Sequence, residues 1–273
     1  MNDINTAFTG SIPQDYDRYL GPMFFHCCAR DLVGRAARQP VRRALEVAAG
    51  TGILTRLLRD RLPADTGIVA TDLNVDMLAH ARGKFGADEN IRFQVADAQA
   101  LPFDDGTFDL ALCQFGIMFC PDKLRALTEA RRVLTAGGRL LFSVWNGLDD
   151  NALPRTVNAI LDELFAGDAP AFLQVPFSYH EQDRLRADLE AAGFGSVDLV
   201  TLDGECRFAD PRQAALGMVT GSPLGVEIGQ RGDIDIETVV EQVSRGIAAA
   251  FGDSDCRVPM RWTVMQAHKD GVS

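Results

Sequence analysis

A chain of 273 residues with 47% hydrophobic and 24% charged residues has the size and balance of one globular domain with insertions. Its net charge of −11, without any cluster of lysine and arginine, argues against nucleic acid or an anionic membrane as a partner, because an acidic surface repels phosphate groups. No run of about 18 apolar residues is present, so we expect no membrane span.

The six cysteines and four histidines follow no pattern that indicates a metal site or a disulfide framework. The N-terminal segment contains Asp3, Asp15 and Asp17 and no long apolar run, so no signal peptide is expected. We therefore expect a cytoplasmic protein with reduced cysteines and no bound metal. The composition leaves the oligomeric state open between a monomer and a homodimer.

The first half of the chain alternates between strand patterns and helix patterns. Residues 1–22 are polar and interrupted by glycine and proline, so the first helix is expected after them. In chain order we predict a helix over 23–38, a strand over 42–50, a helix over 53–62, a strand over 67–73, a helix through about Phe85, strands over 91–97 and 108–115, a helix over about 122–135 that ends at Gly137 and Gly138, and a strand over 139–145.

The second half is less regular. Its Gly/Pro-bearing stretch 221–233 is predicted to be an inserted loop. The remaining pattern predicts a helix over 181–192, a strand near 196–206, helices over about 211–220 and 234–250, and a last strand over 257–268. The alternation over residues 42–145 is typical of an α/β fold with a doubly wound, Rossmann-like parallel sheet and helices on both faces.

The segment 46-EVAAGTG-52 lies at a predicted turn from a strand to a helix. The helix after Gly52 has free N–H groups that suit a carboxylate or a phosphate, although a tight turn alone would also explain the glycines. A dinucleotide fingerprint fits poorly, because Thr55 or Ala48 would stand where such a fingerprint requires glycine.

Three polar residues end the predicted strands that follow this turn. Asp72, 20 residues after Gly52, could accept both hydroxyls of a ribose, or it could cap the next helix. Asp97 could accept the exocyclic amine of adenine, and Gln114 ends the fourth predicted strand. Because ligands bind at the carboxyl edge of such sheets, we expect all three to face one crevice.

Four segments, in this order and spacing, resemble the class I S-adenosylmethionine-dependent methyltransferases, and in particular the ubiquinone/menaquinone-biosynthesis group: EVAAGTG, ATDLNVDML, VADAQALPFDDGTFD and EARRVLTAGGRLLFSVW. The resemblance covers residues 41–146, and Ala48 stands where the family usually has glycine. It implies a seven-stranded sheet whose last strand is antiparallel. It also implies methyl transfer from S-adenosylmethionine to a small-molecule acceptor, with S-adenosylhomocysteine as the product.

The resemblance also implies roles for individual residues. A single domain, 1–273, would comprise an N-terminal lid and helix (1–40), a cofactor-binding core (41–146), and substrate-side insertions with the C-terminal strands (147–273). In that core, the methionine part of the cofactor would be lined by Ala48, Ala49, Gly50 and Gly52, with Gln114 beneath it. Asp72 would hold the ribose. Leu73 and Met77 would lie beside the adenine, and Asp97 and Ala98 would meet its edge.

The segment 16-YDRYLGPMFFHCCARDL-32 looks like the lid that covers the cofactor in similar proteins; it also has the pattern of an amphipathic helix that packs on the sheet, and both roles can hold. Tyr16 is expected to touch the methionine part. His26 is the first candidate for a general base and Tyr19 the second, with a structural role for His26 equally open. We expect catalysis chiefly by positioning. An NAD-type oxidoreductase and a relative that binds the cofactor without methyl transfer remain the alternatives.

Overall fold

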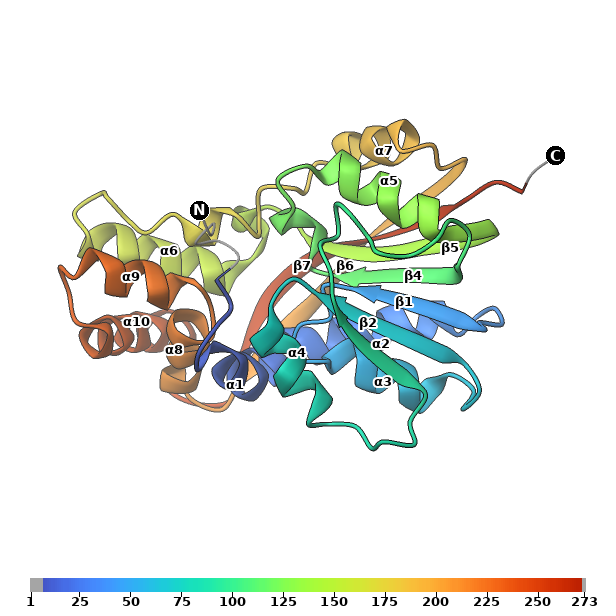
Figure 1. Ribbon diagram of the computed structural model, residues 1–273. Coiled ribbons are helices and arrows are strands. Elements are labelled where there is room, and N and C mark those ends of the chain that lie inside the picture. The colour runs from blue at the N-terminus through green and yellow to red at the C-terminus, as the bar shows by residue number, and fades with distance from the viewer. Residues whose placement is uncertain (1–6, 272–273) are drawn as a thin grey trace.

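The computed structural model describes residues 7–271, in which seven strands form one sheet of order β3-β2-β1-β4-β5-β7-β6 (Figure 1). Of these strands β7 alone runs opposite in direction to the other six, so the seven-stranded sheet with an antiparallel last strand is confirmed. The strands are β1 Arg43–Val47, β2 Gly67–Asp72, β3 Ile91–Val95, β4 Phe108–Gln114, β5 Leu134–Trp145, β6 Ser196–Phe208 and β7 Cys256–His268.

The central strands are apolar runs because helices cover both faces of the sheet. On one face lie α2 (His26–Ala36) and α3 (Ile53–Arg61), and on the other lie α5 (Lys123–Val133) and α7 (Gln182–Ala191) (Figure 1). The helix α4 (Val75–Arg82) contacts β2 and β3. This arrangement is the predicted doubly wound α/β fold.

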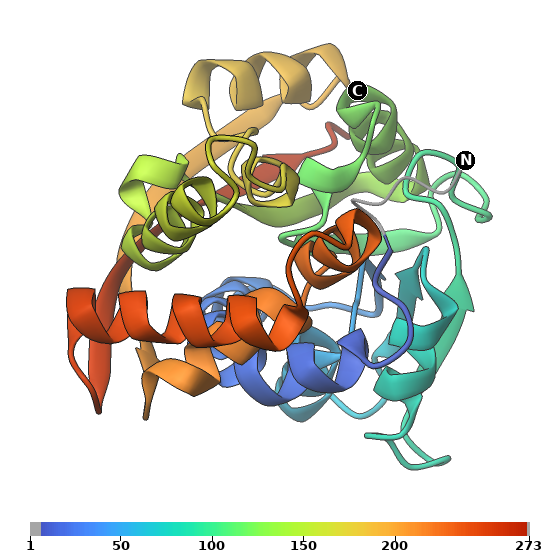
Figure 2. The same ribbon diagram turned by 90° about the vertical axis from the view of Figure 1, so that its left-hand side faces the viewer.

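A layer of helices from the second half of the chain stands beyond the carboxyl ends of the strands. Figure 2 views the molecule from that side, with α10 lying across the front. The layer consists of α6 (Ala152–Leu164), α8 (Pro211–Thr220), α9 (Leu224–Arg231) and α10 (Ile236–Phe251). Short 3₁₀ turns follow β4, β5 and α6, at Ile117–Phe119, Leu148–Asp150 and Phe172–Gln174.

The predicted loop over 221–233 is wrong, because α9 occupies most of that segment. Pro223 stands directly before the helix, where its missing N–H costs nothing. Leu224 and Ile228, four residues apart, are both fully buried. Two glycines in this short helix hid that apolar spacing.

The N-terminal helix begins earlier than predicted. The chain is helical from Ile12 as α1 (Ile12–Asp15), η2 (Tyr16–Phe25) and then α2. The segment η2 is a π-helix with Pro22 inside it, and the N–H of His26 reaches the carbonyl of Gly21, five residues earlier. A pattern search at 3.6 residues per turn reads Gly21 and Pro22 as a break, whereas the wider π turn passes through them.

The boundary between α5 and β5 also differs from the prediction. The helix ends at Val133 and the strand begins at once at Leu134, so Gly137 and Gly138 lie within β5. The register between β4 and β5 shifts there, and Gly137 adopts a positive φ of 75°. The two glycines form an irregularity in the strand instead of ending the helix.

Candidate functional site

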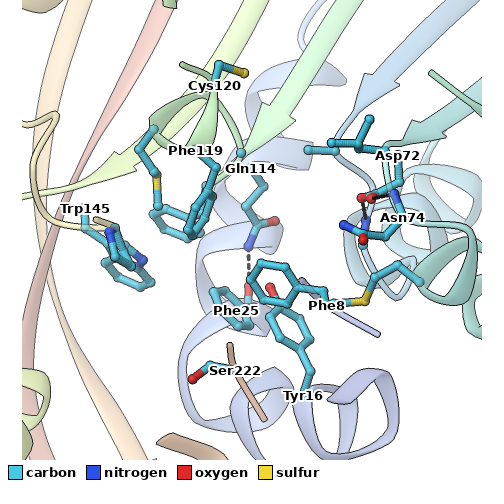
Figure 3. A pocket seen from close by; sticks show the side chains of 18 of the residues that line it. Phe8, Tyr16, Phe25, Asp72, Asn74, Gln114, Phe119, Cys120, Trp145 and Ser222 are labelled. Carbon is cyan, nitrogen blue, oxygen red and sulfur yellow. Dashed lines mark hydrogen bonds between the residues drawn. The ribbon is translucent and has the colours of Figure 1, made fainter. Parts of the chain in front are cut away.

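A cavity of about 220 Å³ lies at the carboxyl edge of the sheet, between the ends of β1–β5, the π-helix η2 and the helical layer. Because the strand order there is β3-β2-β1-β4-β5, the strand ends follow one another along the cavity. The polar residues Asp72 and Asn74 lie on one side of Gln114, whereas Phe119 and Trp145 lie on the other (Figure 3). The cavity therefore has a polar half and an aromatic half.

The turn that follows β1 forms part of the wall of the polar half. Ala48 and Gly50 both adopt positive φ, at 55° and 56°, a region that disfavours a side chain. A Cβ on Gly116 would lie 2.4 Å from the Cβ of Ala48. The alanine that replaces the usual glycine of the family therefore fits because position 116 has no side chain.

Asp72 lies at the end of β2 with its carboxylate in the cavity wall. One oxygen accepts the N–H of Gly50 at 2.8 Å and the other accepts the N–H of Asn74 at 2.8 Å. Burial raises the pKa of this carboxyl. Each oxygen keeps a further lone pair, so the carboxylate can accept two more hydrogen bonds from a ligand.

The second acidic residue of the polar half follows β3, and apolar side chains lie near it. Asp97 accepts the backbone N–H of Gln99 at 2.8 Å and is solvent-exposed, next to Ala98 in the wall. The exposed side chain of Leu73 and the buried side chain of Met77 complete an apolar surface beside Asp72. This part of the polar half therefore combines an exposed carboxylate with an adjacent apolar surface.

Gln114 ends β4 and stands between the two halves. Its Nε2 donates to the carbonyl of Phe25 at 3.0 Å, across to the last residue of η2 (Figure 3). Its Oε1 is buried and has no hydrogen-bond partner among residues 7–271.

The structure brings most of the predicted cofactor residues together and leaves four predicted site residues out of the cavity wall. Those that line the cavity are Tyr16, Ala48, Gly50, Asp72, Leu73, Met77, Asp97, Ala98 and Gln114, and those that do not are Tyr19, His26, Ala49 and Gly52.

Two of the four pack inside the core. Ala49 is buried against Ala70 and Leu78. Gly52 allows close packing on α4, because a Cβ there would lie 3.0 Å from the Cβ of Ala81.

The two candidate bases also lie elsewhere. Tyr19 packs beside Gly217 of α8, under the guanidinium of Arg18. The His26 ring lies next to Gly21 of its own helix, and burial lowers its pKa.

The N-terminal segment covers the cavity and is held on both sides. Asp17 accepts a hydrogen bond from Thr51 at 2.9 Å and pairs with Lys84, which ties η2 to the glycine turn and to the segment that follows α4. Asp15 accepts from Thr220 of α8 at 2.8 Å. The helix therefore bridges the sheet domain and the helical layer.

Aromatic side chains line the other half of the cavity, and most of them were not among the predicted site residues. The rings of Phe115 and Trp145 stack at 3.9 Å, and Phe8 meets Tyr16, Phe119 and Phe172 edge to face. Trp145 contributes to this wall from the end of β5. The aromatic residues that line the cavity are Phe8, Tyr16, Phe24, Phe25, Phe115, Phe119, Trp145, Phe172 and Phe177.

Charge is confined to the polar half. In the described chain, Asp72 and Asp97 are the charged side chains that line the cavity. The side-chain amide of Asn151 in the aromatic half already forms hydrogen bonds within the protein, donating to the carbonyl of Gly147 and accepting the N–H of Arg261.

Among residues 7–271, no helix is long and apolar enough to cross a membrane.

Comparison with known proteins agrees with this geometry. The sequence profile of the methyltransferase domain family matches residues 45–142. The ubiquinone/menaquinone biosynthesis C-methyltransferase UbiE of Idiomarina loihiensis is 33% identical over 178 residues, which are 59% of this chain and 70% of that protein. The UbiE protein of Escherichia coli is 37% identical over 177 residues, 58% of this chain and 68% of that protein.

Solved structures share the fold at low identity. Phosphoethanolamine N-methyltransferase 2 of Haemonchus contortus, in complex with S-adenosylhomocysteine, superposes with a TM-score of 0.63 at 15% identity, over 98% of this chain and 60% of that chain. YcgJ of Bacillus subtilis gives 0.59 at 19% identity, over 90% and 100%. These comparisons favour a methyltransferase over an NAD-type oxidoreductase. The chain belongs to the class I S-adenosylmethionine-dependent methyltransferases, in the group related to the ubiquinone/menaquinone biosynthesis enzymes.

Proposed function

We propose that the acceptor of the methyl group is an uncharged, largely apolar molecule that binds in the aromatic half of the cavity. The observation that carries this proposal is that both charged side chains lining the cavity, Asp72 and Asp97, lie in the polar half. An ammonium, carboxylate or phosphate in the aromatic half would lose its hydration without gaining an opposite charge, which is unfavourable. A neutral ring system would instead gain stacking and apolar contacts there.

The polar half fits S-adenosylmethionine. Asp72 has lone pairs free for two ribose hydroxyls, and Asp97 with Ala98 could meet the amino edge of adenine between Leu73 and Met77. At Gly50 a Cβ would meet nothing within 4 Å, so the backbone there is open to the methionine part. Tyr16, Ala48 and Gln114 line the same region, which supports their predicted contacts, whereas Ala49 and Gly52 would act by shaping the turn.

The surroundings support catalysis by positioning. The bound cofactor supplies an electrophilic methyl group, and in-line placement of an acceptor can lower the barrier by about 7–11 kcal/mol. Among the described residues, no histidine or lysine lines the cavity. Burial raises the pKa of the Tyr16 phenol and brings that of the Cys120 thiol to about 11, so both stay protonated near neutral pH. His26 and Tyr19 lie outside the wall, so a role as base would require them to move.

We also propose that the N-terminal segment is the lid of this site, with residues 1–40 as its extent. Phe8, Tyr16, Leu20, Phe24 and Phe25 all face the cavity, so removing this segment would open both halves to water. Residues 1–6 lie outside the described part of the chain. The six free cysteines support a reducing compartment such as the cytoplasm.

Binding of a probe pair tests the acceptor proposal without knowledge of the natural substrate. A naphthol and the matching naphthoate have the same rings and differ in charge, so titration into the protein saturated with S-adenosylhomocysteine isolates the effect of charge. We expect the naphthol to bind at least about tenfold more tightly. Placing a cation in the wall with Phe172→Lys should reverse this preference, whereas Phe172→Leu should keep it. Tighter binding of the naphthoate to the natural protein would contradict the proposal.

A further inference from the structure

The side-chain amide of Gln114 is fixed in one orientation by the helix that covers the site. Its Nε2 lies 3.0 Å from the carbonyl oxygen of Phe25, which can only accept a hydrogen bond. The amide nitrogen must therefore face η2, and the amide oxygen points away from it, toward the side of Asp72 and Asn74 (Figure 3).

That oxygen is buried without a donor. In residues 7–271 four buried side-chain polar atoms have no partner, on Gln94, Gln114, Ser143 and Trp262, and of these residues Gln114 alone lines the cavity. Burying an acceptor without a hydrogen bond is unfavourable, so Oε1 requires a donor, and a charged donor forms a stronger hydrogen bond with it than water does. The amide therefore favours a ligand that brings a charged N–H group.

The order of the strands indicates which part of the cofactor supplies that donor. Asp97 follows β3, Asp72 ends β2, the glycine turn follows β1, and Gln114 ends β4. A cofactor with its adenine at Asp97 and its ribose at Asp72 therefore reaches Gln114 with its methionine part. The α-ammonium is the strong donor of that part, and neither acidic residue of the wall lies on this side of β1.

We infer that Gln114 accepts a hydrogen bond from the α-ammonium of the cofactor through Oε1 while it holds η2 through Nε2, so that one amide couples occupation of the methionine subsite to closure of the lid. The inference rests on the proposed function, because it takes the polar half to be the cofactor site. Binding of the ammonium to Oε1 fixes the amide with Nε2 toward the carbonyl of Phe25 and so stabilises that contact. The aromatic half, which η2 also walls, is then completed only when the methyl donor is in place.

Two ligands and two variants separate the parts of this inference. S-Adenosylhomocysteine carries the ammonium, whereas 5′-methylthioadenosine has the same nucleoside without the amino-acid part. Gln114→Leu removes both contacts of the amide. Gln114→Glu keeps an acceptor for the ammonium but replaces the donor to Phe25 by a carboxylate oxygen, which a carbonyl repels.

Calorimetry measures the first contact. The natural protein should bind S-adenosylhomocysteine more tightly than methylthioadenosine, and Gln114→Leu should reduce that preference at least about tenfold, the effect of losing a hydrogen bond to a charged group. Methylthioadenosine should bind both proteins alike, which shows that the variant is folded. Gln114→Glu should keep the preference. An unchanged preference in Gln114→Leu would refute the ammonium contact and leave the proposed function standing.

Hydrogen exchange measures the coupling. S-Adenosylhomocysteine should slow amide exchange in residues 16–25 of the natural protein, and this protection should be lost in both variants, although Gln114→Glu still binds the ligand. Full protection in Gln114→Glu would refute the coupling. If the natural protein bound neither ligand, the cofactor assignment of the polar half would fail, and the inference with it.

Discussion

Replacement of Asp72 by asparagine should weaken binding of S-adenosylhomocysteine strongly. The carboxylate holds the N–H groups of Gly50 and Asn74, each at 2.8 Å, and has lone pairs left for two ribose hydroxyls. Hydrogen bonds to a charged group contribute about 1.5–3 kcal/mol each. Losing one hydroxyl contact should therefore weaken binding at least about tenfold, and losing both should weaken it at least about 150-fold. The asparagine amide makes the larger loss the expected one, because its NH₂ must face one of the two backbone donors.

The matched control is Asp109→Asn. Asp109 also accepts two backbone N–H groups, from Arg42 at 2.9 Å and Arg43 at 3.2 Å, but it does so at the opposite edge of the sheet. Isothermal titration should show a large loss of affinity in Asp72→Asn and almost none in Asp109→Asn, with thermal unfolding of both variants measured in parallel. Equal affinities in the natural protein and Asp72→Asn would refute the ribose assignment, and equal losses in both variants would show a general effect of damaged turns.

Three further predictions concern stability and catalysis. Gly116→Ala should destabilise the protein by about 1–3 kcal/mol and lower its melting temperature by several degrees, because the new Cβ would lie 2.4 Å from that of Ala48 and 2.7 Å from Sγ of Cys113. Adding Ala48→Gly should restore part of the lost stability. An unchanged melting temperature in Gly116→Ala would contradict the close contact between positions 48 and 116. Burial raises the pKa of Glu46 to about 8, above its unfolded value, so the stability that its protonated form provides should be lost as pH rises from about 5 to about 8, at up to roughly 1.4 kcal/mol per pH unit. Denaturant unfolding should show this slope in the natural protein and lose it in Glu46→Gln, and equal slopes would contradict the assignment. His26→Ala should reduce turnover less than about tenfold with an unshifted pH–rate profile, since His26 does not line the cavity; a thousandfold loss with the acidic limb abolished would show that His26 is an essential base.

The sheet and the polar half of the site could be predicted because both depend on local sequence. Apolar runs closed by glycine or aspartate specify buried parallel strands, and the ends of parallel strands meet at one edge of a sheet. Asp72, Asp97 and Gln114 each end or follow such a strand, so their common location follows from topology alone.

The aromatic half could not be predicted because its residues come from segments far apart in the chain. Phe8, Phe119, Trp145 and Phe172 meet only after the helical layer has packed on η2, and each alone is indistinguishable from a core residue. Their convergence is a tertiary property that no local pattern carries.

The roles of the N-terminal helix depended on a helical period that the sequence did not reveal. Tyr16, Leu20, Phe24 and Phe25 line the cavity, whereas Tyr19 and His26 do not, and the π-helix that carries the lining residues passes through Gly21 and Pro22. The sequence does contain the spacing that would have revealed α6, since Leu153, Val157 and Leu161 recur every four residues and are fully buried.

The most direct test of the account is a methyl-transfer assay with S-adenosylmethionine that carries a deuterated methyl group. Mass spectrometry would follow the label into matched pairs of acceptors, each pair consisting of a neutral hydroxylated ring system and the same ring system with an added carboxylate or ammonium group. We predict labelled product from the neutral member of a pair, with kcat/KM at least about tenfold above that of its charged partner. Preferential labelling of charged members would contradict the proposed acceptor.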